Sequence, residues 1–154
     1  MQVQTRLVDD QLVLTERGYV SQETIGDWIR SVGDTSFARA SKYGGFAGPE
    51  FIIYFGAVRP GQSAVVENCI PVAAGQQIPL EEAPRIEYAH REVFARLPLK
   101  MCQFPEILEG YDAVNAWIQA NDAEQIGPPR EIYFGDFMSA GPDDDVVDIA
   151  IPIK

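Results

Sequence analysis

The chain has 154 residues, of which 46% are hydrophobic and 23% are charged. These values are ordinary for a packed globular domain and exclude a disordered chain, a fibrous repeat and a coiled coil. The net charge of -11 would repel phosphate backbones and anionic lipid surfaces, so we expect no direct nucleic-acid partner and no membrane partner.

The first ten residues lack the basic and then apolar pattern of a signal segment, and the longest strongly apolar run, 51–58, is too short to cross a bilayer. We therefore expect a cytoplasmic protein. Cys69 and Cys102 lie far apart without a CxxC spacing, which favours buried reduced thiols. The single histidine, His90, argues against a histidine-rich metal site and a histidine-dependent triad, and we expect neither a metal nor a cofactor.

The first half of the chain predicts a strand, a helix and two further strands. The first strand falls within 4–17, and the helix follows Ser21, a residue type favoured at helix N-caps. The wholly apolar run 51–55 is typical of a strand that is covered on both faces, and 65–72 predicts the last strand.

The second half predicts the same order after a linker at 73–84, which is rich in Gly, Gln, Glu and Pro. We expect a strand within 86–97 and a helix with Pro105 at its first position. The apolar stripe of this helix consists of Phe104, Ile107, Leu108, Tyr111, Val114 and Ile118.

The two halves also resemble each other in sequence. Residues 48–56, GPEFIIYFG, match residues 127–135, GPPREIYFG, and the closing strand VVENCIPV at 65–72 matches VVDIAIPI at 146–153. Chance does not readily produce two such matches in the same order, so the chain contains an internal repeat.

The repeat predicts the fold class. We expect one α+β domain over 1–154, built from two βαββ modules at 3–72 and 85–153. The modules would lie side by side about a pseudo-twofold axis, with antiparallel sheets, both helices on one face and a ligand groove between the modules.

One departure from the repeat introduces a charge into the second copy's strand, because Glu131 stands where the first copy has Ile52. The period of two in a strand places Glu131 and Tyr133 on one face, and Ile52 and Tyr54 on the equivalent face of the first module. A carboxylate among such side chains is costly to desolvate unless it is paired, and an incoming cation can pair with it. The pattern leaves open that Glu131 instead points to solvent or pairs with Arg130, Arg96 or Lys100.

Trp28 and Trp117 each fall in a predicted helix, where tryptophan is most often a core residue. Trp117 is the better ligand candidate because it lies off the centre of its stripe. The candidate ligand-binding residues are Glu131, Tyr133, Tyr54, Ile52, Trp117, Tyr111 and Phe104. We assign no catalytic residue.

The string GPPREIY at 127–133, the helix end at Ala116-Trp117-Ile118 and the closing segment 147–153 resemble the GyrI-like small-molecule-binding domain. This family is also called the bacterial transcription activator effector-binding domain. Its first module is similar to this chain at Gly48-Pro49 before Ile53-Tyr54 and at 67–72, so the resemblance covers about 3–153. One departure is Gln103-Phe104-Pro105, which stands where family members often have a Gly-Pro-aromatic helix start.

The resemblance implies a domain that binds hydrophobic, often cationic, drug-like molecules in the groove between its modules, with Glu131 meeting the positive charge. Family members occur as effector domains of regulators and as stand-alone proteins. The stretch before Val3 has no room for a helix-turn-helix module, so this chain resembles the stand-alone kind.

Two other functions stay open beside this multidrug-binding interpretation. Some family members resemble hydrolases of strained cyclopropane rings in natural products, where a carboxylate and a tyrosine would direct water to the electrophile. The gyrase inhibition for which the family is named would instead use the acidic surface to bind a protein partner. Whether the chain is an enzyme therefore stays open, with binding alone preferred.

Overall fold

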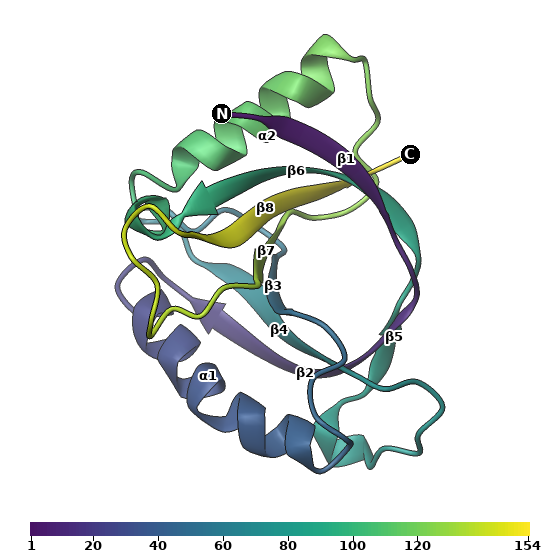
Figure 1. Ribbon diagram of the computed structural model, residues 1–154. Coiled ribbons are helices and arrows are strands. Elements are labelled where there is room, and N and C mark those ends of the chain that lie inside the picture. Colours follow the sequence, from purple (N-terminus) through teal and green to yellow (C-terminus); the bar gives the residue numbers. More distant parts are fainter. The chain divides into compact units, whose positions relative to one another are not determined.

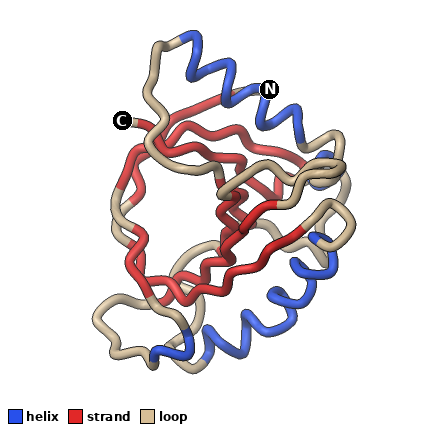
Figure 2. Tube along the Cα trace, turned by 180° about the vertical axis from the view of Figure 1, so that it is seen from behind, coloured by secondary structure: helices blue, strands red, loops and turns tan.

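The computed structural model describes all 154 residues, which form two compact units. Unit 1 contains Met1–Asp9 and Ala89–Lys154, and unit 2 contains Asp10–Tyr88. In each unit four strands pair in antiparallel fashion. One α-helix packs on the strands of each unit (Figures 1 and 2). The predicted α+β class with antiparallel sheets is thus confirmed.

Unit 1 has the strand order β1-β6-β8-β7, and helix α2 packs on β6 and β8 (Figure 1). Its elements are β1 (Val3–Val8), β6 (His90–Pro98), the short 3-10 helix η2 (Leu99–Met101), α2 (Leu108–Ala120), β7 (Arg130–Tyr133) and β8 (Asp145–Ile153).

Unit 2 has the order β5-β2-β4-β3, and helix α1 packs on β2 and β4. Its elements are β2 (Gln11–Val20), α1 (Ile25–Ser41), β3 (Glu50–Tyr54), β4 (Ala64–Val72), the 3-10 helix η1 (Leu80–Glu82) and β5 (Arg85–Glu87).

The units differ from the expected modules in one respect. The stretch 4–17 is not one strand, because Asp9 and Asp10 separate β1 from β2, and aspartate disfavours strands. Strand β1 then pairs with β6, whereas β5 pairs with β2. The repeat is therefore ββαββ, and the first strand of each copy joins the sheet that contains the rest of the other copy.

The beginnings of the two helices follow different local chemistry. Ser21 and Thr24 hydrogen-bond reciprocally, because each side-chain oxygen accepts from the other residue's backbone N–H, at 3.2 and 2.9 Å. This arrangement closes the turn that leads into α1, but α1 begins at Ile25 with Thr24 as its N-cap, so the predicted N-cap role of Ser21 is wrong. Pro105 does not open α2, however, because it lies in a turn with a cis peptide bond after Phe104, and the helix begins at Leu108.

The face of each sheet that lies away from its helix buries a carboxylate between two arginines. In unit 2, Glu67 is paired with Arg17 of the neighbouring strand and with Arg85 of the edge strand. Burial raises the pKa of Glu67, but the hydrogen bonds from Arg85 and Arg17 outweigh burial and hold the pKa below its ordinary value.

Unit 1 repeats this arrangement with Asp148. Arg96 of the neighbouring strand donates to it at 2.8 and 3.0 Å, and Arg6 of edge strand β1 donates at 2.8 Å. Arg6 also pairs with Glu92, which accepts from His90 as well. The repeat thus extends to a pair of buried ionic clusters that sequence matching alone did not indicate.

Candidate functional site

Glu131 lies on the face of the unit 1 sheet that α2 covers. It is paired in register with Ile149, which belongs to a buried cluster with Leu97 and Val147. Tyr111 of α2 and Tyr133 of β7 pack against the same cluster. The Glu131 side chain therefore belongs to the space between strand β7 and helix α2, and the residue is only 6% exposed.

Two tyrosine hydroxyls hold the Glu131 carboxylate. Tyr111 donates to Oε2 at 2.6 Å and Tyr133 donates to Oε1 at 2.7 Å, so each oxygen accepts one hydroxyl. Hydrogen bonds to a charged acceptor are roughly twice as strong as neutral ones and fix the orientation of the carboxylate. We name Glu131, Tyr111 and Tyr133 the acidic cluster.

A glycine brings Tyr111 close enough to reach β7. At the preceding position, Gly110, an added Cβ would lie 2.8 Å from Leu97 Cδ1 and 2.9 Å from Ile149 Cγ1. A larger residue would force the Leu97 and Ile149 side chains or the helix itself to shift, so the glycine permits the short separation between helix and sheet. The distance from Tyr111 to Glu131 depends on this approach.

The surroundings of the acidic cluster are mostly apolar. Besides the three buried aliphatic residues, the residues that pack there are Met101, Cys102 and Ile107. Burial, with the negative charge of Glu131 as the second cause, raises the pKa of the Cys102 thiol to about 11. The thiol is thus neutral near pH 7, and the cluster combines one oriented carboxylate with apolar walls.

The open alternatives for Glu131 can now be compared with the structure. The carboxylate does not point to solvent, because it is buried. Arg96 binds Asp148, and Lys100 binds Asp143 at 2.6 Å. Arg130 precedes Glu131 in the strand and so points to the opposite face of the sheet.

The remaining candidate residues do not join the acidic cluster within unit 1. Trp117 packs against a different group of core residues, formed by Val93, Ala95, Val114, Ile151 and Ile153. Phe104 is 47% exposed in the turn before α2. Ile52 and Tyr54 belong to β3 of unit 2, where both are buried. The structure thus brings together three of the seven candidates.

Unit 2 has a carboxylate of its own that sequence analysis overlooked. Glu50 Oε2 accepts from Ser36 Oγ of α1 at 2.6 Å and from Asn68 Nδ2 of β4 at 3.2 Å. Burial raises the pKa of Glu50, and these two hydrogen bonds offset only part of that effect. A further departure from the repeat could have revealed this residue in the sequence, because Glu50 stands where the other copy has Pro129.

Cys102 and Met101 were also missed as neighbours of Glu131. No periodic pattern covers them, since they lie in and just after the short helix η2 that follows β6. Only the path of the chain between β6 and α2 brings them to the cluster.

The fold has well-defined relatives among solved structures. The crystal structure of the EcmrR C-terminal domain is similar with a TM-score of 0.78 and 16% sequence identity, over 99% of this chain and 97% of that chain. The fold expected from the resemblance to GyrI-like effector-binding domains is thereby confirmed.

Three other solved structures have a similar fold. SAV2435 bound to tetraphenylphosphonium is similar with a TM-score of 0.65 and 14% identity, over 100% of this chain and 94% of that one. A hydrolase from Listeria innocua has a TM-score of 0.61 and 10% identity, over 99% and 92%. The chain is also similar to EcmrR as it occurs in an EcmrR–DNA complex, and it spans 57% of that EcmrR chain. At these identities the likeness is one of fold.

No protein-family model and no curated protein matches the sequence. Neither α-helix has both the length and the apolar character that a membrane span requires.

Proposed function

We propose that the acidic cluster binds an amphipathic organic cation, whose charge lies near Glu131 and whose apolar groups pack on the surrounding aliphatic and aromatic side chains. The observation that carries the proposal is the buried Glu131 carboxylate, 6% exposed and oriented by the hydroxyls of Tyr111 and Tyr133. A desolvated carboxylate gains from a cation that enters its site, because little water competes for the charge.

The likeness of fold supports the class of ligand. SAV2435, with the same fold, is described as bound to tetraphenylphosphonium, a large cation with four aromatic rings. Such a cation has no hydrogen to donate, so it would not have to displace either tyrosine hydroxyl from the carboxylate. The net charge of -11 favours the approach of cations over anions to the protein as a whole.

Calorimetric titration with tetraphenylphosphonium tests this proposal. Glu131→Gln removes the charge and should weaken binding by about 1.5 to 3 kcal/mol, the Coulomb energy of two unit charges about 6 to 10 Å apart at an effective dielectric constant of about 20, which is roughly tenfold to 150-fold in Kd. The matched control is Glu50→Gln, which removes a partly buried carboxylate from the other unit and should leave the affinity unchanged. Equal affinity in wild type and Glu131→Gln would refute the assignment.

A hydrolase is the second candidate function. The hydrolase from Listeria innocua has a similar fold, and a carboxylate between two tyrosine hydroxyls can orient a water molecule as well as a cation. Incubation with a strained cyclopropane electrophile would distinguish the two functions. Product formation that is lost in Glu131→Gln and reduced in Tyr111→Phe supports turnover, whereas binding without product supports the first proposal.

A protein-binding function through the acidic surface predicts a different pattern. The affinity for a protein partner would survive Glu131→Gln and fall as salt screens the surface charges.

A further inference from the structure

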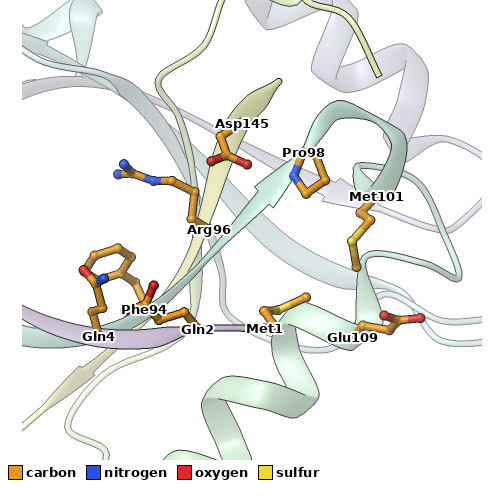
Figure 3. Close-up of a pocket in the computed structure, with 9 residues that line it drawn as sticks. All are labelled: Met1, Gln2, Gln4, Phe94, Arg96, Pro98, Met101, Glu109 and Asp145. Carbon is orange, nitrogen blue, oxygen red and sulfur yellow. The ribbon is translucent and has the colours of Figure 1, made fainter. Parts of the chain in front are cut away.

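Unit 1 has a pocket that does not involve the acidic cluster. Its volume is about 490 Å³, within the range of about 300 to 1,000 Å³ that is typical of small-molecule sites. It lies where edge strand β1 meets the end of β6, helix η2 and the first turn of α2 (Figure 3). Its lining residues are Met1, Gln2, Gln4, Phe94, Arg96, Pro98, Met101, Glu109 and Asp145.

Three sheet residues of the pocket, Gln4, Phe94 and Arg96, belong to the face that α2 does not cover. Phe94 and Arg96 alternate along β6 with Val93, Ala95 and Leu97, which pack on the α2 side. Gln4 of β1 is the register partner of Phe94 and so points the same way. These three residues and the acidic cluster therefore lie on opposite faces of the sheet, while Met101 lines the pocket and also packs against the apolar residues beside the acidic cluster.

One side of the pocket is apolar and is lined by flexible side chains. In Figure 3 the side chain of Met101 lies next to Pro98, and that of Met1 lies below them, between Gln2 and Glu109. Thioethers are polarisable and flexible, and they pack well against aromatic rings. The Phe94 ring also lines the pocket, although it is only 8% exposed and the Arg6 guanidinium lies 3.9 Å from its centroid. This combination fits a flat aromatic group better than a sugar or another strongly hydrated molecule.

The charges around the pocket favour a cation. Arg96 is already neutralised, because two of its nitrogens donate to the buried Asp148. Asp145 and Glu109 form no side-chain hydrogen bond and no ion pair, although Asp145 lies close enough to Arg96 to contribute to its raised pKa. The two carboxylates outnumber the one remaining positive charge, the α-amino group of Met1, and leave the pocket net negative.

We propose that this pocket is a second ligand site, which takes a flat aromatic monocation with its ring against Met1, Met101 and Phe94 and its charge toward Asp145. The site uses none of the residues of the acidic cluster. Its existence therefore does not depend on the function proposed for Glu131.

The methionines provide a direct test, because the chain has only three. Met1 and Met101 line the pocket, whereas Met138 is 96% exposed and lies elsewhere. Protein labelled with 13C at the methionine methyl groups is titrated with N-methylquinolinium and followed by NMR. We expect the Met1 and Met101 signals to shift along one saturating curve while the Met138 signal stays in place.

Variants separate the two sites. Asp145→Asn combined with Glu109→Gln should weaken the binding curve of Met1 about fivefold, the upper scale of exposed ion pairs. The control pair Asp112→Asn with Glu124→Gln removes the same charge from exposed positions and should change little. Glu131→Gln should leave the Met1 curve unchanged, since Met1 is not part of the acidic cluster.

Neutral quinoline serves as the matched probe, and it should bind wild type at least fivefold more weakly than N-methylquinolinium. The proposal is overturned if Met1 does not shift, if Met138 shifts equally, or if the Met1 response disappears in Glu131→Gln. Equal binding of the two probes would overturn the assignment of the ligand as a cation. A loss of tetraphenylphosphonium binding in Glu131→Gln with an intact Met1 response would leave both sites standing as separate sites.

Discussion

The two units share their buried ionic clusters but differ on the faces that their helices cover. On the faces away from the helices, Glu67 and Asp148 each lie between one arginine of a neighbouring strand and one arginine of an edge strand. On the helix-covered faces, unit 1 has Glu131 between two tyrosines, whereas unit 2 has Ile52 at the matching position.

Packing on the helix-covered faces differs as well. In unit 1, Gly110 of the helix lies close to Leu97 of the sheet, whereas in unit 2 the indole of Trp28 in the helix covers Gly18 of the sheet. The small residue thus comes from the helix in one unit and from the sheet in the other. The comparison suggests that the ionic clusters stabilise the repeated scaffold, while the helix-covered faces carry the specialised chemistry.

The largest effect should come from breaking the shared ionic clusters. Arg85→Met leaves Glu67 buried with one partner fewer, and Arg6→Met does the same to Asp148 and Glu92. We expect each change to cost about 3 to 5 kcal/mol of unfolding free energy, measured with urea. Arg30→Met, which removes an exposed helical ion pair, should cost less than about 1 kcal/mol. If Arg85→Met lost no more unfolding free energy than Arg30→Met, the ionic clusters would not stabilise the fold.

The same clusters predict a pH dependence. The folded pKa values of Glu67 and Glu92 are lowered, so their stabilisation is present above the ordinary carboxyl pKa and is lost as pH falls through the lower folded values. Urea unfolding of wild type should therefore become easier on acidification, and Arg85→Met should show a smaller acid-dependent loss.

Glycine-to-alanine substitutions in the two helices should change the stability of the protein in opposite directions. At Gly110 an added methyl group meets Leu97 and Ile149, so Gly110→Ala should destabilise by about 1 to 3 kcal/mol. At Gly33 of α1 an added Cβ meets nothing within 4 Å, so Gly33→Ala should stabilise by about 0.5 to 1 kcal/mol. Thermal unfolding of both variants measures the two changes in stability. If Gly110→Ala stabilised the protein as Gly33→Ala does, the close approach of α2 to the sheet would be contradicted. Gly110→Ala should also weaken tetraphenylphosphonium binding if Tyr111 must reach Glu131.

The smallest effect is expected for the carboxylate of unit 2. Both hydrogen bonds to Glu50 go to the same oxygen, so the oxygen of a glutamine side chain can accept both. Since burial raises the folded pKa, charging Glu50 opposes folding, and wild type should gain stability as pH falls through that value. Glu50→Gln should therefore be slightly more stable than wild type at neutral pH, by less than about 1 kcal/mol, and equal to it at acidic pH. A lower melting temperature for Glu50→Gln at neutral pH would show that the charge is needed for folding.

The sequence predicted the types and order of most elements because they depend on local signals. The matching strings at 48–56 and 127–135 identified β3 and β7 together, and the helical spacing of apolar residues identified the second helix. It did not predict that β1 and β5 exchange sheets, because an alternating strand fits any edge with a free ladder and local pattern does not specify the partner.

The candidate site was predictable only in part. Glu131 and Tyr133 share a strand face, and a period of two suffices to place them together. Tyr111 belonged to the predicted helical stripe, but its hydrogen bond to Glu131 requires the close approach at Gly110. Trp117 lies on the same helix two turns later and packs into a separate part of the core, which stripe membership could not reveal.

By itself the sequence determined that this is a duplicated α+β fold with one exceptional carboxylate in its second copy, because repeats and single departures from them are visible residue by residue. Only the tertiary structure decided which arginines neutralise Glu67 and Asp148, which hydroxyls orient Glu131, and which residues surround the pocket beside Met1. The physical reason is that each of these arrangements joins segments that are distant in the chain, and their separation in space depends on sheet pairing and on the distance between helix and sheet.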